Sequence, residues 1–124
     1  AAGNFGPSAP PAFPAAHPDV VAVAAVDSRK RNWRGGNRGD YLEGVAPGVD
    51  VTSAGPNGGY AEWTGTSFAV PFAIAALLRA RAETGGDPAL ARALITSRAE
   101  DLGAPGRDPM FGYGLVQVAG DRCS

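Results

Sequence analysis

Ser67, in the stretch TGTSFAVPF, is the residue of this chain whose neighbours are best suited to nucleophilic catalysis. The apolar run after it predicts a helix, so Ser67 would lie at the positive end of a helix dipole beside unpaired backbone N–H groups. Such groups can stabilise the oxyanion that forms when a serine attacks a carbonyl. Pro71 would remove the helix hydrogen bond to the Ser67 carbonyl, which is costly in a purely structural helix. Ser67 is therefore a candidate nucleophile.

A structural role for the same triplet is the alternative. Thr66 or Ser67 could be the N-cap of the helix, with a hydroxyl that accepts a hydrogen bond from an N–H of the first turn. The triplet taken alone favours this interpretation. An α/β-hydrolase esterase is a poor match, because Ala69 stands where the G-x-S-x-G elbow of that class requires its second glycine.

A serine nucleophile also needs a base to accept its proton. The single histidine, His17, lies in a proline-rich loop and is a weak candidate. Asp27, Asp40 and Asp50 are equally weak candidates for the acid, because each lies at a predicted strand end or in a loop with no histidine to orient. We therefore expect the base and the acid to come from outside these residues.

The strands that would position Ser67 are short. The apolar run 20–26 predicts a strand buried on both faces, as in a parallel sheet. One or two further strands are expected within 41–56, interrupted at Pro47-Gly48. Asn57-Gly58 then predicts a hairpin turn.

Two helices are expected to follow. The first runs from Thr66 to Ala82 and ends at Gly85-Gly86; it is apolar on every side for three turns, which is typical of a central helix wrapped by other elements. The second begins with Asp87 as N-cap and a proline at the first helical position, and one of its faces carries Leu90, Leu94 and Ile95. Strands alternating with helices predict an α/β fold with a parallel sheet.

Composition excludes several classes of function. A length of 124 residues allows one small domain, and a net charge of −1 indicates no attraction to nucleic acid or membranes. The longest uncharged apolar run, 68–78, is too short to span a bilayer. Five of the eleven basic residues lie in the loop 27–40, which we interpret as a solvated loop in preference to a phosphate-binding patch. Cys123 has no second cysteine to pair with and is either a free thiol or paired with another chain.

Five motifs together resemble the subtilisin-like serine proteases. GTSFAVPFAIAAL is similar to the serine motif of that family, Gly-Thr-Ser-Met-Ala-x-Pro-His. The other four occur in the family's order: AAGN at 1–4, FPAAHPDVVAVAAVD at 13–27, VAPGVDV at 45–51 and GYGLV at 112–116. Phe68 and Phe72 replace the usual Met and His, and both are expected to pack.

The resemblance implies a role for each matching residue. Ser67 would be the nucleophile, and Asn4 would donate its side-chain amide to the oxyanion together with the Ser67 N–H. The residues implied in substrate binding form a pocket suited to a large apolar side chain; they are Ala1, Ala2, Gly3, Ala12 and Thr66. No cofactor is implied. Some family members bind a cation near Glu43, but the single acid in this proline-rich region leads us to predict no metal.

The resemblance also places the catalytic Asp and His before the serine in the chain. Residues 1–124 are therefore expected to be the C-terminal portion of a doubly wound α/β/α protease domain, with the N-terminal portion as partner and a peptide or protein as substrate. A secreted or periplasmic location is favoured. The alternatives are a catalytically inactive protease-like binding module and a homo-oligomer whose identical copies cover the central strand and helix.

Overall fold

The computed structural model describes residues 1–118 of the chain, so Cys123 lies outside the described residues. Its centre is a parallel pair of strands, β1 (Ala22–Val26) and β2 (Leu42–Pro47). Every residue of β1 is buried, as expected for a strand that is covered on both faces. The parallel pairing that the sequence predicts is confirmed. The crossover between the strands, 27–41, contains no helix, although parallel strands are usually joined by one.

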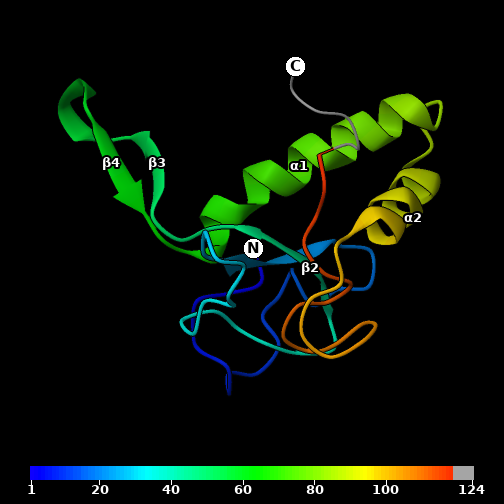
Figure 1. The fold of residues 1–124 in the computed structure, drawn as a ribbon, viewed down its shortest axis with the longest axis horizontal. Helices are drawn as coiled ribbons and strands as arrows, with labels where there is room; N and C mark the ends of the chain where they lie inside the picture. The colour runs from blue at the N-terminus through cyan, green and yellow to red at the C-terminus, as the bar shows by residue number, and fades with distance from the viewer. Residues whose placement is uncertain (119–124) are drawn as a thin grey trace.

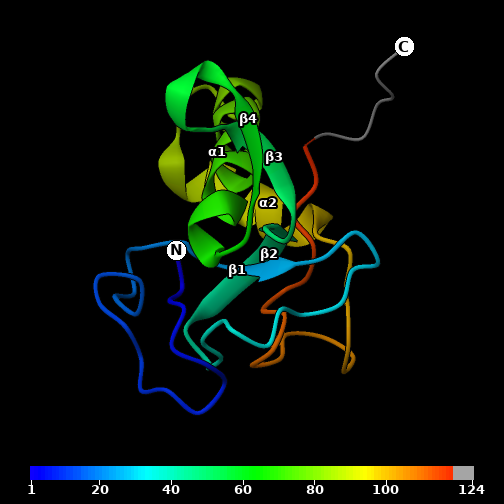
Figure 2. The ribbon, with the colours of Figure 1, turned by 90° about the vertical axis from the view of Figure 1, so that its left-hand side faces the viewer.

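The two helices lie on one face of this sheet and the irregular segments lie on the other (Figures 1 and 2). The helical face buries a cluster made of Val23, Ala25, Ala46, Ala69 and Ala73. Small side chains dominate this cluster, so helix α1 (Thr66–Glu83) can approach the strands closely. The opposite face packs against the loops through a cluster that includes Ala2, Ala15, Leu42, Val45 and Phe111. The observed architecture is the predicted α/β class.

Helix α1 begins differently from a helix capped by its own side chains, but it ends as the sequence predicts. Its N-cap position is Gly65, and no side chain of the helix caps its N-terminus. The alternative in which Thr66 or Ser67 is the N-cap is therefore wrong, and Thr66 is already the first helical residue. The end of the helix agrees with the sequence, because Gly85 and Gly86 both adopt the positive φ that suits glycine after a helix.

Helix α2 (Pro88–Arg98) packs against α1. Asp87 is its N-cap as predicted, since the Asp87 side chain accepts hydrogen bonds from two N–H groups of the first turn. The buried face of α2 is centred on Ala91 and Ile95. Leu90, which was expected on the same face as Ile95, is instead exposed, because the smaller Ala91 occupies the contact with α1.

An antiparallel hairpin precedes α1 and projects away from the body of the molecule (Figure 1). It consists of β3 (Val51–Ala54) and β4 (Tyr60–Trp63), joined through the short 3-10 turn η1 (Pro56–Gly58). Asn57 and Gly58 both have positive φ, which explains the strong turn signal of this dipeptide. Because Ala54 pairs with Tyr60, the loop is five residues long (55–59) and not the two-residue turn that Asn-Gly favours.

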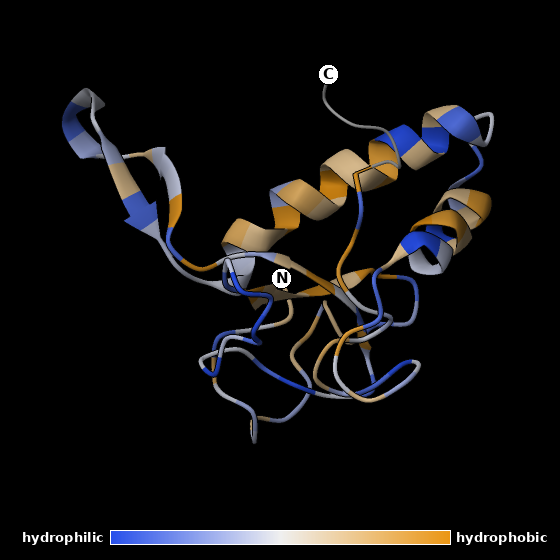
Figure 3. Ribbon diagram, viewed as in Figure 1, coloured by the Kyte–Doolittle hydropathy of each residue, from blue (hydrophilic) through white to orange (hydrophobic). Residues whose placement is uncertain are grey.

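The outer face of α1 is apolar and uncovered by the described residues. Figure 3 shows apolar residues along most of the helix, with hydrophilic residues towards its C-terminal end. Ile74 is 49% exposed and Leu78 is 61% exposed. The elements that would wrap α1 on every side are thus not found among residues 1–118, as expected for a chain too short to surround a central helix. No helix in this part of the chain is long and apolar enough to cross a membrane.

Candidate active site

Ser67 is the second residue of α1 and is exposed. Its hydroxyl makes no side-chain hydrogen bond with any residue that the structure describes, so it is not engaged in capping. Its backbone N–H belongs to the first turn, where N–H groups have no partner within the helix. The side chain is therefore accessible, and it lies at the positive end of an 18-residue helix dipole.

Thr66, the residue before Ser67, joins α1 to the N-terminal segment. The Thr66 side chain is fully buried, and its Oγ1 donates to Asn4 Oδ1 over 2.7 Å. The Thr66 backbone N–H donates to the same oxygen over 3.0 Å. Oγ1 in turn accepts from the backbone N–H of Gly3 over 3.2 Å. Asn4 thus supplies the cap that α1 does not take from its own side chains.

These bonds also determine which way the Asn4 amide points. A backbone N–H can only donate, so the atom that faces Thr66 must be the carbonyl oxygen of the amide. The amide nitrogen Nδ2 is left without a hydrogen-bond partner among residues 1–118. It lies against the chain before Ser67, because a Cβ added to Gly65 would be 3.4 Å from it. A fixed amide donor and a helix N-terminus therefore adjoin the same serine, which is an arrangement that can stabilise an oxyanion.

A second amide, that of the buried Asn37, holds the segment around the exposed Asn4. Asn37 Oδ1 accepts from the backbone N–H of Phe5 over 2.9 Å, and the Asn37 N–H donates to the carbonyl of Gly3 over 2.9 Å. The fit is close, because a Cβ on Gly3 would approach the Asn37 amide to 2.7 Å. Sequence reasoning did not identify Asn37, since nothing in its local pattern indicates a contact 32 residues away.

None of the weak candidates for base and acid contacts Ser67. His17 Nδ1 accepts from the backbone N–H of Asp19 over 3.1 Å, in an exposed turn. Asp27 is paired with Arg31 over 2.7 Å. Asp50 is bonded to Thr64 in the approach to the helix. Asp40 contributes only its backbone carbonyl, to Arg107.

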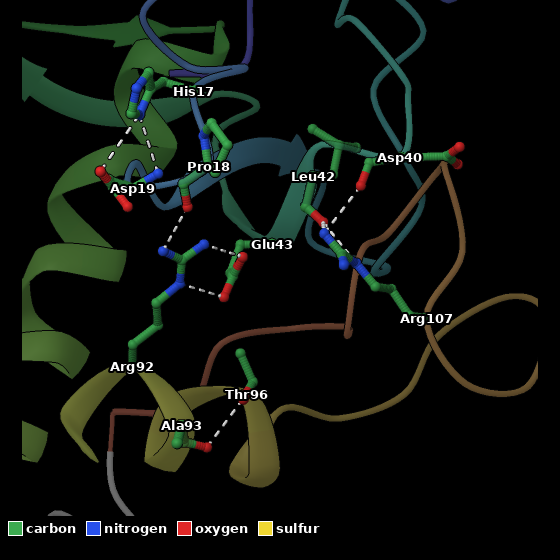
Figure 4. A network of polar contacts seen from close by, with 10 residues as sticks. All are labelled: His17, Pro18, Asp19, Asp40, Leu42, Glu43, Arg92, Ala93, Thr96 and Arg107. Atoms are coloured by element: carbon green, nitrogen blue, oxygen red, sulfur yellow. Dashed lines mark hydrogen bonds and ion pairs between the residues drawn. The ribbon is translucent and has the colours of Figure 1, made fainter. Parts of the chain in front are cut away.

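The side chain of Glu43, which occupies the position of the cation ligand in some family members, is paired with Arg92 (Figure 4). Arg92 donates to both carboxylate oxygens over 2.9 Å each, and its third nitrogen donates to the carbonyl of Pro18 over 2.8 Å. The hydrogen bond to Glu43 raises the pKa of Arg92 above its usual value. Among residues 1–118, no three His, Cys, Asp or Glu side chains gather as a metal site.

The residues expected to bind substrate lie in different environments. Ala1 is exposed, Gly3 and Ala12 are half-buried, and Ala2 is fully buried in the core. Ala2 could therefore contribute to a pocket through its backbone but not through its methyl group. Their role in substrate binding stays a prediction.

The two phenylalanines that replace the usual Met and His behave differently. Phe68 packs as expected, with its ring stacked on Trp63 at 5.8 Å between centroids. Phe72 was also expected to pack, but it is 39% exposed, because it belongs to the uncovered side of α1.

An exposed serine at a helix N-terminus, beside a fixed amide and on an α/β fold with a parallel sheet, is an arrangement that a serine hydrolase requires. Comparison with known proteins identifies the family to which the chain belongs. The sequence profile of the subtilase family, peptidase S8, matches residues 1–114. The chain therefore belongs to the subtilase family of serine proteases.

Individual relatives agree with this assignment. The chain is 42% identical to the minor extracellular protease Epr of Bacillus subtilis, over 94% of this chain and 18% of Epr. It is 35% identical to subtilisin of Bacillus pumilus, over 95% of this chain and 43% of that protein. The solved structure of the prenylagaramide maturation protease PagA superposes with a TM-score of 0.74 at 29% identity, covering 94% of this chain and 46% of PagA. The chain thus spans less than half the length of each of these proteins.

Proposed function

We propose that this chain forms the serine-bearing side of an endopeptidase site, with Ser67 as nucleophile and Asn4 as oxyanion donor. Ser67 Oγ would attack the carbonyl carbon of a peptide bond and give a tetrahedral oxyanion. The Asn4 amide nitrogen and the Ser67 backbone N–H would hold that oxyanion. Collapse would release the amine product and leave an acyl-serine, which water would then hydrolyse.

One observation carries this proposal. Asn4 and Ser67 are 63 residues apart in sequence, yet two bonds from Thr66 fix Asn4 Oδ1, and the amide nitrogen lies against Gly65 at the start of α1. A cap could be made by any nearby Ser, Asp or Asn. The Asn4 amide caps the helix with its oxygen and leaves its nitrogen beside an exposed serine, without a partner among the described residues. A role as oxyanion donor accounts for both features, whereas a capping role accounts only for the first.

The base and the acid would be supplied by residues outside these 124, in the same polypeptide or in a second one. Support comes from the exposed position of His17, which bonds to Asp19 and not to Ser67. The uncovered apolar face of α1 offers a surface for such a portion, because large apolar side chains such as Leu78 gain free energy when they are buried. The substrate would be a peptide with a large apolar residue before the scissile bond.

A protease-like binding module without catalysis is the second candidate. It is favoured by the same absence of a contact between His17 and Ser67 in the described chain. In that case the apolar face of α1 would bind a partner or a second copy, and Ser67 would remain unreactive.

A serine-directed fluorophosphonate probe separates the two. We expect strong labelling when the chain is combined with a subtilase portion that contains Asp and His, feeble labelling of the chain alone, and none of the Ser67→Ala variant. A mixture that forms a complex but does not label Ser67 would refute the catalytic proposal and favour the binding module.

A further inference from the structure

A pocket of about 730 Å³, lined mainly by the crossover loop, takes no part in the proposed chemistry. Its lining includes Asp27, which directly follows β1, and Val49, which lies two residues after β2. It is therefore at the carboxyl edge of the parallel strands, where ligands bind in open α/β sheets. The remaining wall comes mainly from the crossover loop, with Trp33 at its centre.

Backbone contacts connect this pocket to the serine. The Gly48 N–H donates to the carbonyl of Val26 at the end of β1 over 3.0 Å, and the Gly48 carbonyl accepts from the Gly65 N–H over 2.8 Å. Val49 in the pocket and Thr66 before the serine each directly follow one of these two glycines. A path of two bonded glycines therefore separates the pocket from the start of α1.

The crossover loop makes a second connection. Trp33 packs against the cluster that contains Ala69 of α1. A Cβ added to Gly36 would lie 3.4 Å from the Thr66 methyl group. Asn37 then binds the Asn4 segment, as described above. The loop that forms the pocket wall thus also borders both halves of the serine site.

The pocket carries excess positive charge, although the whole chain has a net charge of −1. Four basic side chains line it against one acid, Asp27. Two of the four are neutralised: Arg31 by Asp27 over 2.7 Å, and Lys30 by Glu100 over 2.9 Å. The other two, Arg34 and Arg38, pair with no carboxylate among residues 1–118.

Arg38 is held in place by a neutral group. Its Nε and Nη2 donate to Asn32 Oδ1 over 3.2 and 3.1 Å, and Asn32 Nδ2 is itself fixed to the carbonyl of Met110 over 2.8 Å. An amide oxygen orients the guanidinium without cancelling its charge. A guanidinium that is oriented beforehand loses less entropy when it binds a carboxylate, and its planar shape suits two parallel hydrogen bonds.

We propose that this pocket is a subsite for acidic side chains of the peptide substrate, with Arg34 and Arg38 as specificity-determining residues. The inference rests on the proposed function, because it assumes that a peptide passes Ser67. A substrate residue that extends from Ser67 towards Trp33 would bring its carboxylate to the guanidinium groups of Arg34 and Arg38. Neutral residues at that position would gain nothing from them.

Peptide binding in the Ser67→Ala background tests the proposal without turnover, in the complete polypeptide that carries the chain. Two labelled peptides place Glu-Glu on one or the other side of a large apolar residue, and each has a Gln-Gln counterpart. We expect one of the Glu-Glu peptides to bind about 3- to 10-fold more tightly than its counterpart at low salt, as partly exposed ion pairs allow. The preference should shrink at 0.5 M NaCl.

Charge-removing variants then locate the effect. Arg34→Gln and Arg38→Gln should each reduce the Glu-over-Gln preference, and the double variant should abolish it. Arg29→Gln is the matched control, because Arg29 belongs to the same loop but does not line the pocket. Arg34→Gln is expected to fold like the parent chain, since Arg34 makes no hydrogen bond or ion pair with the described residues that the substitution would remove.

Equal binding of all Glu and Gln peptides would overturn the proposal. So would an Arg29→Gln effect as large as that of Arg34→Gln, since the preference would then reflect general charge. A protein that discriminates between the peptides but never labels with a fluorophosphonate would refute the proposed catalysis and leave the acidic subsite standing.

Discussion

Replacing Thr66 by valine is the sharpest test of how the Asn4 amide is held. The two side chains have nearly the same shape, so the change removes a hydroxyl and little volume. The lost hydroxyl donates to Asn4 Oδ1 and accepts from the Gly3 N–H in a fully buried position. Leaving that N–H unpaired inside the protein should cost about 1–3 kcal/mol of stability.

The kinetic effect should be smaller than that of deleting the amide. In Thr66→Val, Asn4 Oδ1 keeps its bond from the Thr66 backbone N–H, so the amide is loosened and not released. Losing one neutral hydrogen bond of about 0.5–1.5 kcal/mol predicts a fall in kcat of about 2- to 10-fold with little change in KM. Asn4→Leu removes the donor itself and should lower kcat by about 10²–10³, the magnitude measured for the equivalent loss in subtilisin.

The assay is hydrolysis of a chromogenic peptide by the assembled protease, with urea unfolding measured in parallel. Thr66→Ser is the control: it keeps the hydroxyl and should retain kcat within about twofold, while losing about 0.5–1.5 kcal/mol of stability with its methyl group. If Thr66→Val is less stable but hydrolyses as fast as the wild type, the hydroxyl does not position the amide and the reasoning fails.

Three further changes test the surrounding structure. Arg92→Met should destabilise the chain by about 2–3 kcal/mol in urea unfolding. This loss is smaller than for a fully buried ion pair, because Glu43 is 8% exposed but Arg92 is 32% exposed. A loss of stability below about 0.5 kcal/mol would contradict the pairing. The pKa of Asp27 is lowered from 3.8, chiefly by the hydrogen bond from the Arg31 backbone N–H. The ionised Asp27 carboxylate therefore stabilises the fold at pH values above its pKa in the unfolded chain. This stabilisation disappears as the pH falls through the pKa of Asp27 in the folded protein. An NMR titration should therefore find a pKa below 3.8 that rises only partly in Arg31→Gln, which keeps the backbone bond. Asp87→Ala should lose about 1 kcal/mol of stability with the α2 cap, and an unchanged urea midpoint would argue against that cap.

The secondary structure could largely be predicted because its signals are local. The apolar run at β1, the glycines after α1 and the Asp87-Pro88 start of α2 each act within a few residues of themselves. The local pattern did not predict which side chain of α2 is buried against α1, because Ala91 is buried and the larger Leu90 is exposed. Close packing between α1 and α2 selects the smaller side chain, and periodicity alone does not contain that information.

Motifs in the sequence could indicate the residues of the candidate site but not the contacts that hold them together. Motifs pointed to Ser67 and Asn4, whose catalytic roles stay predictions, and the alternative of a helix capped by Thr66 or Ser67 is excluded by the structure. In the structure Gly65 is the N-cap, and the cap oxygen comes from Asn4, 62 residues before Thr66. Asn37 was missed for the same reason. Contacts between distant segments depend on how the strands bring their neighbours together, and a single sequence does not display that placement.

The way the Asn4 segment is anchored shows how a loop can hold a side-chain amide accurately in place. The N–H of Ala2 donates to the carbonyl of Val23 in β1 over 2.9 Å. Gly3 is bonded on both its N–H and its carbonyl, to Thr66 and Asn37, and Phe5 is bonded to Asn37. The residues on either side of Asn4 are thus fixed to the sheet and to the crossover.

Only the Asn4 side chain is then left to be oriented, and Thr66 does this from the helix that carries the serine. An electrostatic donor is effective when it does not have to reorganise as charge develops, and this requires support from rigid elements. Here the same bonds that dock the N-terminal segment on β1 and α1 also aim the amide. A variant that loosens this docking, even far from Ser67, should therefore lower kcat before it unfolds the protein.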